Sequence, residues 1–466
     1  MTRVLALERA GRETRLAVIE DGRLCEIHFE RAGHADLAGN IYAGRVQNVL
    51  RGMNAAFVDI GLKKNGFLSA DEIAHELKPG HMVAVQVDKE PGGGKGPRLT
   101  GKLSLPGRLV ALLPGIRYAG VSKKIPEGAE RDRLFAIASR LSEAQGHGII
   151  VRTAGEGAPE EELTADFERL ARDWKRIEAE ARHSASPKLI RAGGDLVLRA
   201  VREMLNDGVE RVRTDDEELY AQLRAHAEAL APQYADRIEF VRTQTPLFDL
   251  LRVDRQIEQA LERRVNLKSG GNLVIDETEA LTVIDVNTAK FTGSWSLRET
   301  IYRLNCEAAD EIARQLRLRD VGGIIIIDFI DMDLEDDRQA LLEHLCGALA
   351  ADPNRVNVLG MTALGLVEMT RKRERQPLHR QLMHDCAACR GTGRAWSHES
   401  LVYRAARELW RRRRGGDATA YRIVTGEKVA GWLKTLGLPE GGPARVDASG
   451  SDGGFEILPD DSGGNL

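Results

Sequence analysis

A run of four isoleucines constrains the fold of this 466-residue chain more than any other feature. The run, residues 324–327, follows two glycines and ends at Asp328. An apolar run of this length predicts a strand that is covered on both faces. A strand pair is expected at residues 271–288, and an amphipathic helix is expected between the two, at residues 298–318. This strand–helix–strand order predicts an α/β domain.

The length and the charge limit what the rest of the chain can be. A chain of this length needs several domains, because single cores stop growing well before 466 residues. The net charge of −4, from 67 Lys and Arg against 71 Asp and Glu, excludes a globally basic nucleic-acid binder. No apolar run is long enough to span a membrane, and the N-terminus turns polar too early for a signal peptide. We therefore expect a cytoplasmic protein.

Two aspartates at strand ends are the candidate catalytic residues. Asp285 and Asn287 are two residues apart in a predicted strand, so their side chains point to one face. Asp328 is expected where the isoleucine strand ends. Two carboxylates and an amide form an oxygen-only site that suits Mg²⁺, which can activate water and neutralise a phosphodiester. From spacing alone, an ordinary turn or helix cap at each aspartate remains open.

One cysteine pair is spaced like a metal site. Cys386 and Cys389 form a C-x-x-C motif, which supplies two of the four ligands that structural zinc requires. Within one chain, nearby histidines could supply the others: His379, His384 and His398. A redox pair is the third alternative, although the surroundings lack the expected strand-to-helix context.

Two sequence segments identify a family. Residues 307–320 (EAADEIARQLRLRD) and 328–332 (DFIDM) closely resemble the bacterial ribonuclease E/G family. The resemblance runs from the N-terminus to the cysteine pair and has four separate motifs in the family's order. The chain ends without the long disordered arm of the larger members, so it is most similar to the shorter ribonuclease G branch.

The resemblance implies a multidomain α/β (α+β) protein. A ribonuclease-H-like subdomain would carry an inserted OB-fold and a 5′ sensor, followed by a deoxyribonuclease-I-like catalytic domain and a zinc-link. The implied boundaries are 1–35 with 198–260 for the ribonuclease-H-like part, 36–101 for the OB-fold, 102–197 for the sensor, 261–382 for the catalytic domain, 383–397 for the zinc-link and 398–466 for a small C-terminal domain with a flexible, disordered tail.

The implied activity is Mg²⁺-dependent cleavage of single-stranded RNA, leaving a 5′ phosphate and a 3′ hydroxyl, in ribosomal RNA processing and messenger RNA decay. By motif match, Asp285 and Asp328 hold the Mg²⁺ and Asn287 positions one of them. A non-catalytic RNA-binding protein with the same fold is the alternative. Intact catalytic residues argue against it.

The resemblance also assigns RNA contacts in the barrel. Short strands with turn signals in residues 36–101 predict a small barrel. Phe57 and Phe67 fit the family's aromatic platform, on which bases stack, and Lys95 would contact phosphate. The residues themselves favour the alternative that both phenylalanines fill the barrel core.

A 5′-phosphate sensor is implied by residues 148–153 (GIIVRT). Arg152 would bind a terminal monophosphate bidentately, Thr153 would add a hydroxyl and Gly107 matches a pocket glycine. Ala111 replaces a larger aliphatic residue expected in the pocket wall. The ordinary alternative is that Arg152 is an exposed residue in a surface ion pair.

The family resemblance implies that zinc is shared. Two chains would each donate Cys386 and Cys389, which links a homodimer, and relatives pair two dimers into a homotetramer. The basic run 411–414 closes a predicted helix that begins near Ser400, and it suits either RNA contact or a solvated helix face.

Overall fold

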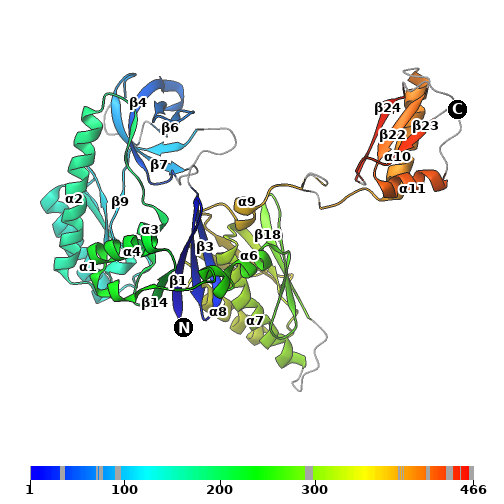
Figure 1. Cartoon of the computed structure of the whole chain (residues 1–466). Helices are drawn as coiled ribbons and strands as arrows, with labels where there is room; N and C mark the ends of the chain where they lie inside the picture. The colour runs from blue at the N-terminus through cyan, green and yellow to red at the C-terminus, as the bar shows by residue number, and fades with distance from the viewer. Residues whose placement is uncertain are drawn as a thin grey trace. The chain divides into compact units, whose positions relative to one another are not determined.

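The computed structural model of the protein describes residues 2–31, 37–69, 72, 77–89, 96–288, 297–386, 389, 391, 393–415, 420–436, 444–451 and 453–460. The chain divides into two compact units, Met1–Leu378 and His379–Leu466. The first unit holds four sheets and the second holds one (Figure 1). The expectation of a mixed α/β protein is therefore confirmed. Among the described residues, no helix is both long enough and apolar enough to cross a membrane.

The N-terminal hairpins join strands from far along the chain. The order of this sheet is β15-β14-β1-β2-β3, and β1 runs parallel to β14. The two-residue turn between β2 and β3 has positive φ at both Asp21 and Gly22, as a type I′ hairpin turn requires. Helices α3 (Leu196–Arg199) and α4 (Glu217–Leu230) pack on the sheet. The strands are β1 (Arg3–Ala10), β2 (Glu13–Glu20), β3 (Arg23–Arg31), β14 (Val209–Thr214) and β15 (Ile238–Phe240).

Five short strands close into a barrel, as the sequence predicted. The order β4-β5-β6-β8-β7 returns to β4, because β4 also pairs with β7. Closure of this kind leaves no edge strand and gives an OB-like barrel. A further strand, β13 (Lys188–Arg191), pairs with β4. The barrel strands are β4 (Ile41–Leu50), β5 (Ala55–Asp59), β6 (Gly66–Ser69), β7 (Met82–Lys89) and β8 (Arg98–Thr100).

A small sheet with two helices follows the barrel in sequence. The sheet order is β11-β12-β10-β9, and α1 (Ala129–Gln145) and α2 (Glu160–His183) contribute to its apolar core. The strands are β9 (Leu105–Pro106), β10 (Val110–Leu113), β11 (Ala119–Val121) and β12 (Gly148–Val151).

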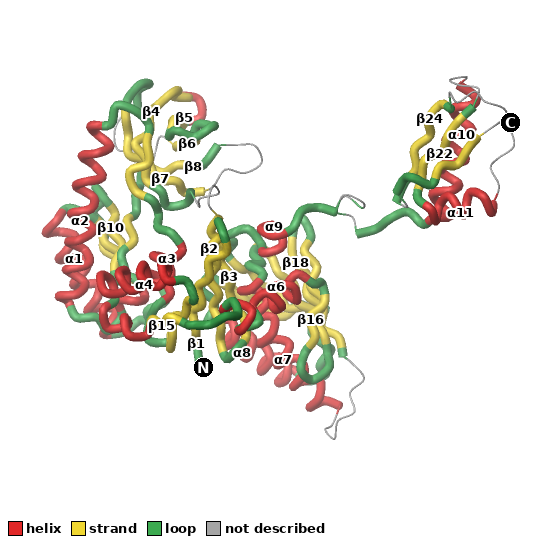
Figure 2. Tube along the Cα trace, viewed as in Figure 1, coloured by secondary structure: helices red, strands yellow, loops and turns green. Residues whose placement is uncertain are grey.

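The sheet that carries the candidate catalytic residues has the order β16-β17-β18-β19-β21-β20. Helices α7 (Leu297–Leu318) and α8 (Glu335–Leu349) pack on one side of it and share its apolar core with the strands (Figure 2). Two short helices, α5 (Leu247–Leu250) and α6 (Val253–Leu261), precede it. Its strands are β16 (Arg264–Asn266), β17 (Asn272–Glu277), β18 (Leu281–Asn287), β19 (Gly323–Asp328), β20 (Val356–Met361) and β21 (Leu366–Arg371).

The isoleucine strand β19 is covered on one face only, so the expectation of burial on both faces is wrong. Ile325 and Ile327 are fully buried against the helices, whereas Ile324 is 51% exposed. Alternate side chains of a strand point to opposite faces, and Ile324 therefore marks the open face. Asp328 lies on that same face, because it is four residues further along the strand.

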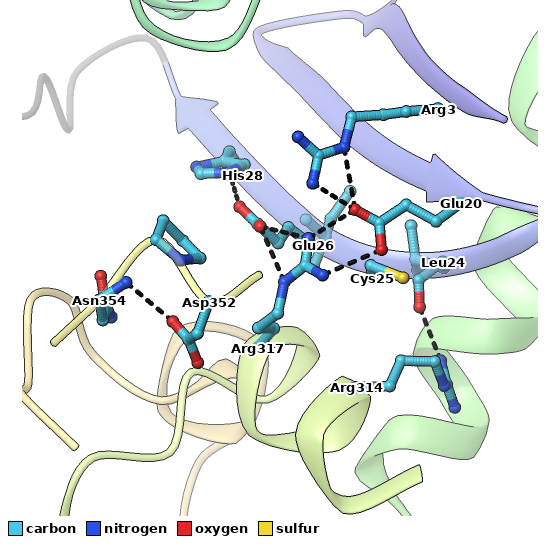
Figure 3. Close-up of polar contacts among 12 residues, drawn as sticks. Arg3, Glu20, Leu24, Cys25, Glu26, His28, Arg314, Arg317, Asp352 and Asn354 are labelled. Carbon is cyan, nitrogen blue, oxygen red and sulfur yellow. Dashed lines mark hydrogen bonds and ion pairs between the residues drawn. The ribbon is translucent and has the colours of Figure 1, made fainter. Parts of the chain in front are cut away.

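A buried ionic cluster joins the N-terminal sheet to α7 (Figure 3). Arg317, near the end of α7, donates to Glu20 at 2.9 Å and to Glu26 at 2.8 Å. Arg3 makes a second ion pair with Glu20, and His28 lies 3.4 Å from Glu26. Buried carboxylates need such partners, so this cluster fixes α7 against the first sheet.

The second unit corrects the prediction of a disordered tail. Residues 444–447 and 455–459, within the Gly, Asp and Ser-rich stretch, form strands on either side of β22. Leu409 and Ile423 belong to the core under this sheet. The elements are α9 (Leu378–Leu382, which begins at the end of the first unit), α10 (His398–Gly415), β22 (Tyr421–Thr425), α11 (Glu427–Leu436), β23 (Ala444–Asp447) and β24 (Phe455–Pro459).

Candidate active site

Asp285 and Asp328 lie directly beside each other on neighbouring strands. Strands β18 and β19 are parallel, and Asp285 is the register partner of Asp328. Neighbouring strands are about 4.8 Å apart, so the two side chains leave the same face as close neighbours. Asp285 is half-buried and Asp328 is exposed. Helix α7 makes the crossover between the two strands, as parallel pairing requires.

Asn287 holds one of the two carboxylates. Its Nδ2 donates a 2.7 Å hydrogen bond to Oδ2 of Asp285, two residues earlier in β18. On the adjacent strand β17, Asn272 is the register partner of Asn287. Oδ1 of Asn272 is buried and has no hydrogen-bond partner among the described residues. The register places this unpaired oxygen on the strand next to Asn287.

Three carboxylates gather at this edge of the sheet without a basic partner in the described part of the chain. Burial, together with the charges of Asp285 and Asp331, raises the pKa of Asp328 above its ordinary value. Among the residues that the structure describes, neither Asp285, Asp328 nor Asp331 makes an ion pair with a basic side chain. Such a group of carboxylates suits a divalent cation.

Asn305 is a residue of this site that the sequence interpretation missed. It is fully buried in α7, donates from Nδ2 to the carbonyl of Ile330 at 2.8 Å and accepts from the Ile330 amide at 3.1 Å. It therefore fixes the backbone between Asp328 and Asp331. The available signal was a polar residue on the helix face that Leu304 and Ala308 bury.

The segment after β19 is held on its other side by α8. Arg338 Nε donates a 2.8 Å hydrogen bond to the carbonyl of Met332. Helices α7 and α8 thus each fix one point of the loop that follows Asp328.

Arg152 and Thr153 follow β12, on a different sheet from the aspartates. Arg152 is half-buried and donates through Nη1 to the carbonyl of Gly107. Burial lowers the pKa of its guanidinium, and within the described part of the chain it has no ion-pair partner. The alternative of an exposed Arg in a surface ion pair is therefore wrong. Thr153 Oγ1 lies 3.0 Å from Oγ of Ser122.

Gly107 is required by the packing around Arg152. A Cβ at this position would come within 2.5 Å of a carboxylate oxygen of Asp166 and within 2.8 Å of the Val110 carbonyl. Asp166 accepts from the amides of Leu109 and Val110, which fixes the turn. Ala111, in β10 opposite Ile150, is half-buried.

Phe57 and Phe67 form an edge-to-face pair on the outside of the barrel. They are register partners on β5 and β6, with ring centroids 6.1 Å apart and planes at 73°. Phe67 is 38% exposed and Phe57 is half-buried, so neither fills the barrel core. Lys95, the predicted phosphate contact, lies outside the described residues.

The cysteine pair lies in the second unit. Cys386 is exposed and Cys389 is half-buried, and the two do not form a disulfide with each other. The amide of Gly393 donates to Sγ of Cys389 at 3.3 Å. Among the described residues, which include His379, His384 and His398, no three His, Cys, Asp or Glu side chains are grouped as a metal site would require.

The sequence is similar to those of known ribonucleases. The model described as the ribonuclease E/G family matches residues 104–374. The chain is 40% identical to ribonuclease G of Escherichia coli over 93% of both chains, and 41% identical to ribonuclease G of Haemophilus influenzae over 86% of this chain and 85% of the relative. It is also 42% identical to ribonuclease E of Nostoc sp., over 81% of this chain and 57% of that relative. On these matches, the chain belongs to the ribonuclease E/G family.

Proposed function

We propose that this protein is a Mg²⁺-dependent endoribonuclease that hydrolyses single-stranded RNA to 5′-phosphate and 3′-hydroxyl ends, in ribosomal RNA processing and messenger RNA decay. The observation that carries the proposal is the pairing of Asp285 with Asp328 across β18 and β19. Family membership makes the chain an endoribonuclease, and hence a hydrolase, because the similar proteins are named ribonucleases G and E. The metal, the substrate ends and the processes are our proposals.

The residues present fit a magnesium ion. Asp285 and Asp328 would hold it, and the raised pKa of Asp328 indicates carboxylate charge that a cation would stabilise. The free oxygen of Asn272 is available to an ordered water. When bound, Mg²⁺ would activate water and neutralise charge on the scissile phosphate. The protein itself keeps the carboxylates oriented, through the hydrogen bond from Asn287 to Asp285.

Two other surfaces support single-stranded RNA with a 5′ monophosphate as the preferred substrate. The exposed pair of Phe57 and Phe67 offers rings on which bases can stack, and stacking is available only to unpaired bases. Arg152 carries a guanidinium without an ion-pair partner among the described residues, and Thr153, the next residue, carries a hydroxyl. A terminal monophosphate would supply the anion that this guanidinium lacks.

We further propose a zinc-linked homodimer. Cys386 and Cys389 give two thiolate ligands, and a tetrahedral site needs four. A second copy of the chain would supply the other two, and two such dimers could form a homotetramer. Metal analysis of the purified protein should give about one zinc per two chains. One zinc per chain would favour a site completed within the chain instead.

The deciding assay for cleavage uses a short, 5′-monophosphorylated, single-stranded RNA with Mg²⁺. Asp285→Asn and Asp328→Asn should each lower the cleavage rate by more than roughly 10–100-fold, which is the loss expected when a residue that only hydrogen-bonds to a metal ligand is replaced. Asp276→Asn is the matched control, because Asp276 lies on the adjacent strand β17 and pairs with Arg263. If both active-site variants cut as well as the parent, the catalytic assignment is wrong. If the parent binds this RNA and never cuts it, the chain is a non-catalytic RNA-binding protein.

A further inference from the structure

A cavity of about 270 Å³ opens beside the segment that follows Asp328. Its walls come from the first turn of α7, the first turn of α8 and the loop between β19 and α8. Both helices begin where the parallel strands β18 and β19 lead into them, so the cavity lies at the carboxyl edge of that pair. In α/β sheets, ligands characteristically bind in crevices at this edge.

The cavity has apolar walls. The side chains that provide them are Leu297, Ile301, Met332 and Leu334. Met332 is buried, whereas Leu297 is 77% exposed and Leu334 is 43% exposed. Apolar surface of this kind, open to solvent next to a catalytic site, is suited to a flat, largely apolar group.

The charges at the cavity disfavour a phosphate as its occupant. Asp331 and Asp333 contribute carboxylates to the lining. Arg298, the guanidinium among the described lining residues, is held by two hydrogen bonds of 2.7 and 2.9 Å to Asp337, so its charge is already compensated. The charge that remains among the described lining residues is negative, which repels the RNA backbone and attracts hydrogen-bond donors. Adenine, guanine and cytosine each offer an amino group to a carboxylate, whereas the ring N3–H of uracil lies between two carbonyl oxygens that a carboxylate repels.

The cavity is also coupled to the catalytic carboxylates by a fixed backbone. Asp331, in the lining, is three residues after Asp328 on the segment that leaves β19. Asn305 holds Ile330 between the two residues. A group bound in the cavity would therefore have a defined position relative to the two aspartates.

We propose that this cavity receives the base of one nucleotide next to the scissile phosphate, and that it prefers bases with an amino group (adenine, guanine or cytosine) over uracil. The inference rests on the proposed RNA cleavage. The apolar walls contact the ring, and the carboxylate of Asp333, in the lining, accepts a hydrogen bond from the amino group. The pocket thus contributes to the choice of cleavage position.

The test uses a single-site RNA in which each nucleotide near the cleaved bond is replaced, one at a time, by an abasic nucleotide. For the parent protein, kcat/KM should fall about tenfold or more at one position, as expected when one base contact is lost. At that position, removing only the amino group (inosine for guanosine, purine riboside for adenosine) should cause part of the fall. Equal rates with every abasic substrate would overturn the inference while leaving the proposed cleavage intact.

Two variants locate the effect in the cavity. Ile301→Phe fills it and should lower kcat/KM on intact RNA while abolishing the difference between intact and abasic substrates. Asp333→Asn, an exposed change that does not risk the fold, should reduce the preference for amino-bearing bases. Ile324→Phe, on the open face of the same sheet, and Asp336→Asn, in α8 outside the lining, are the matched controls.

Two results would overturn the assignment. One is an undiminished difference in kcat/KM between intact and abasic RNA in Ile301→Phe, and the other is an unchanged base preference in Asp333→Asn. Failure of the parent to cut any RNA would instead overturn the proposed function.

Discussion

Asn287 donates a 2.7 Å hydrogen bond to the carboxylate of Asp285, and the two residues share one face of β18. The bond uses Oδ2 of Asp285 and restricts how its carboxylate can rotate. A carboxylate held in one orientation needs little rearrangement when it binds a cation, so the amide contributes to pre-organisation of the site.

Replacing Asn287 should therefore weaken the metal site without preventing RNA binding. Asn287→Ala should raise the Mg²⁺ concentration for half-maximal cleavage and lower kcat, by roughly 10–100-fold in total, as for outer-shell partners at other metal sites. The measurement is a Mg²⁺ titration of cleavage at saturating RNA. Asn266→Ala, on the edge strand β16, is the control. An unchanged Mg²⁺ dependence would show that the hydrogen bond does not orient a ligand.

Asn305 should act on the same site through the backbone. Asn305→Leu removes both hydrogen bonds to Ile330, which leaves buried backbone groups unpaired and costs about 1–3 kcal/mol of stability. If the residue positions the loop, the folded variant should also show a lower kcat and a weaker response to Mg²⁺, with KM for RNA unchanged. Asn357→Leu, an exposed change in β20 of the same sheet, is the control. Lower stability with a normal Mg²⁺ titration would make Asn305 a structural residue only.

The sequence predicts side-chain positions well where they depend only on the two-residue repeat of a strand. Alternation in a strand places Asp285 and Asn287 on one face, and their hydrogen bond agrees with that prediction. The pairing of Asp285 with Asp328 was compatible with the sequence but not required by it, because register depends on contacts between distant segments. Asn305 was missed because one polar residue in a helix ordinarily indicates a solvent-facing position.

Two predictions were wrong for the same physical reason: the composition of a segment does not determine which distant segments pack against it. The isoleucine run predicted burial on both faces, yet helices cover only the face of Ile325 and Ile327. Residues 455–459 lie in a polar, glycine-rich stretch, yet they pair with β22 and bury Ile457. Short strands of this kind are specified by the sheet they join.

Arg152 should discriminate between RNA ends. Arg152→Ala removes a charge-assisted contact with a terminal phosphate, which is worth about 1.5–3 kcal/mol, or roughly 10–100-fold in kcat/KM on 5′-monophosphorylated RNA. RNA with a 5′ hydroxyl should be cut at nearly the parental rate. Arg140→Ala, which breaks an exposed ion pair with Glu160 on the same subdomain, is the control. Equal losses on both RNAs would remove the sensor assignment.

Phe67 should contribute to substrate affinity rather than to the chemical step. Phe67→Ala removes a 38% exposed ring, and loss of one stacked base costs about 1–3 kcal/mol, or roughly 5–100-fold in KM. Tyr at the same position should restore most of the affinity, because a ring remains available. The readouts are KM and kcat on single-stranded RNA. Phe135→Ala, at a 51% exposed position on α1, is the control, and a matching rise in its KM would contradict the platform.

Arg317 should make the stability of the first unit depend on pH. Its hydrogen bonds help to lower the pKa of Glu20 to about 2 from 4.5, and Glu26 is shifted in the same direction. Because these folded pKa values are depressed, the stabilisation is complete above pH 4.5 and is lost as the pH falls towards 2. Arg317→Met leaves two buried carboxylates without this partner, which should cost about 3–5 kcal/mol at neutral pH.

The pH profile separates this mechanism from a simple packing defect. Urea unfolding of the parent and of Arg317→Met should give a difference that is largest at neutral pH and shrinks as the pH falls, because the variant's carboxylates, which lack Arg317, take up protons more readily than those of the parent and then no longer bury an unpaired charge. Arg303→Met on the same helix breaks an exposed ion pair with Glu299 at 2.8 Å and should cost no more than about 1 kcal/mol. A deficit in Arg317→Met that stays constant from neutral to acidic pH would mean that lost packing dominates, because removal of a paired charge cannot leave the proton linkage of Glu20 and Glu26 unchanged.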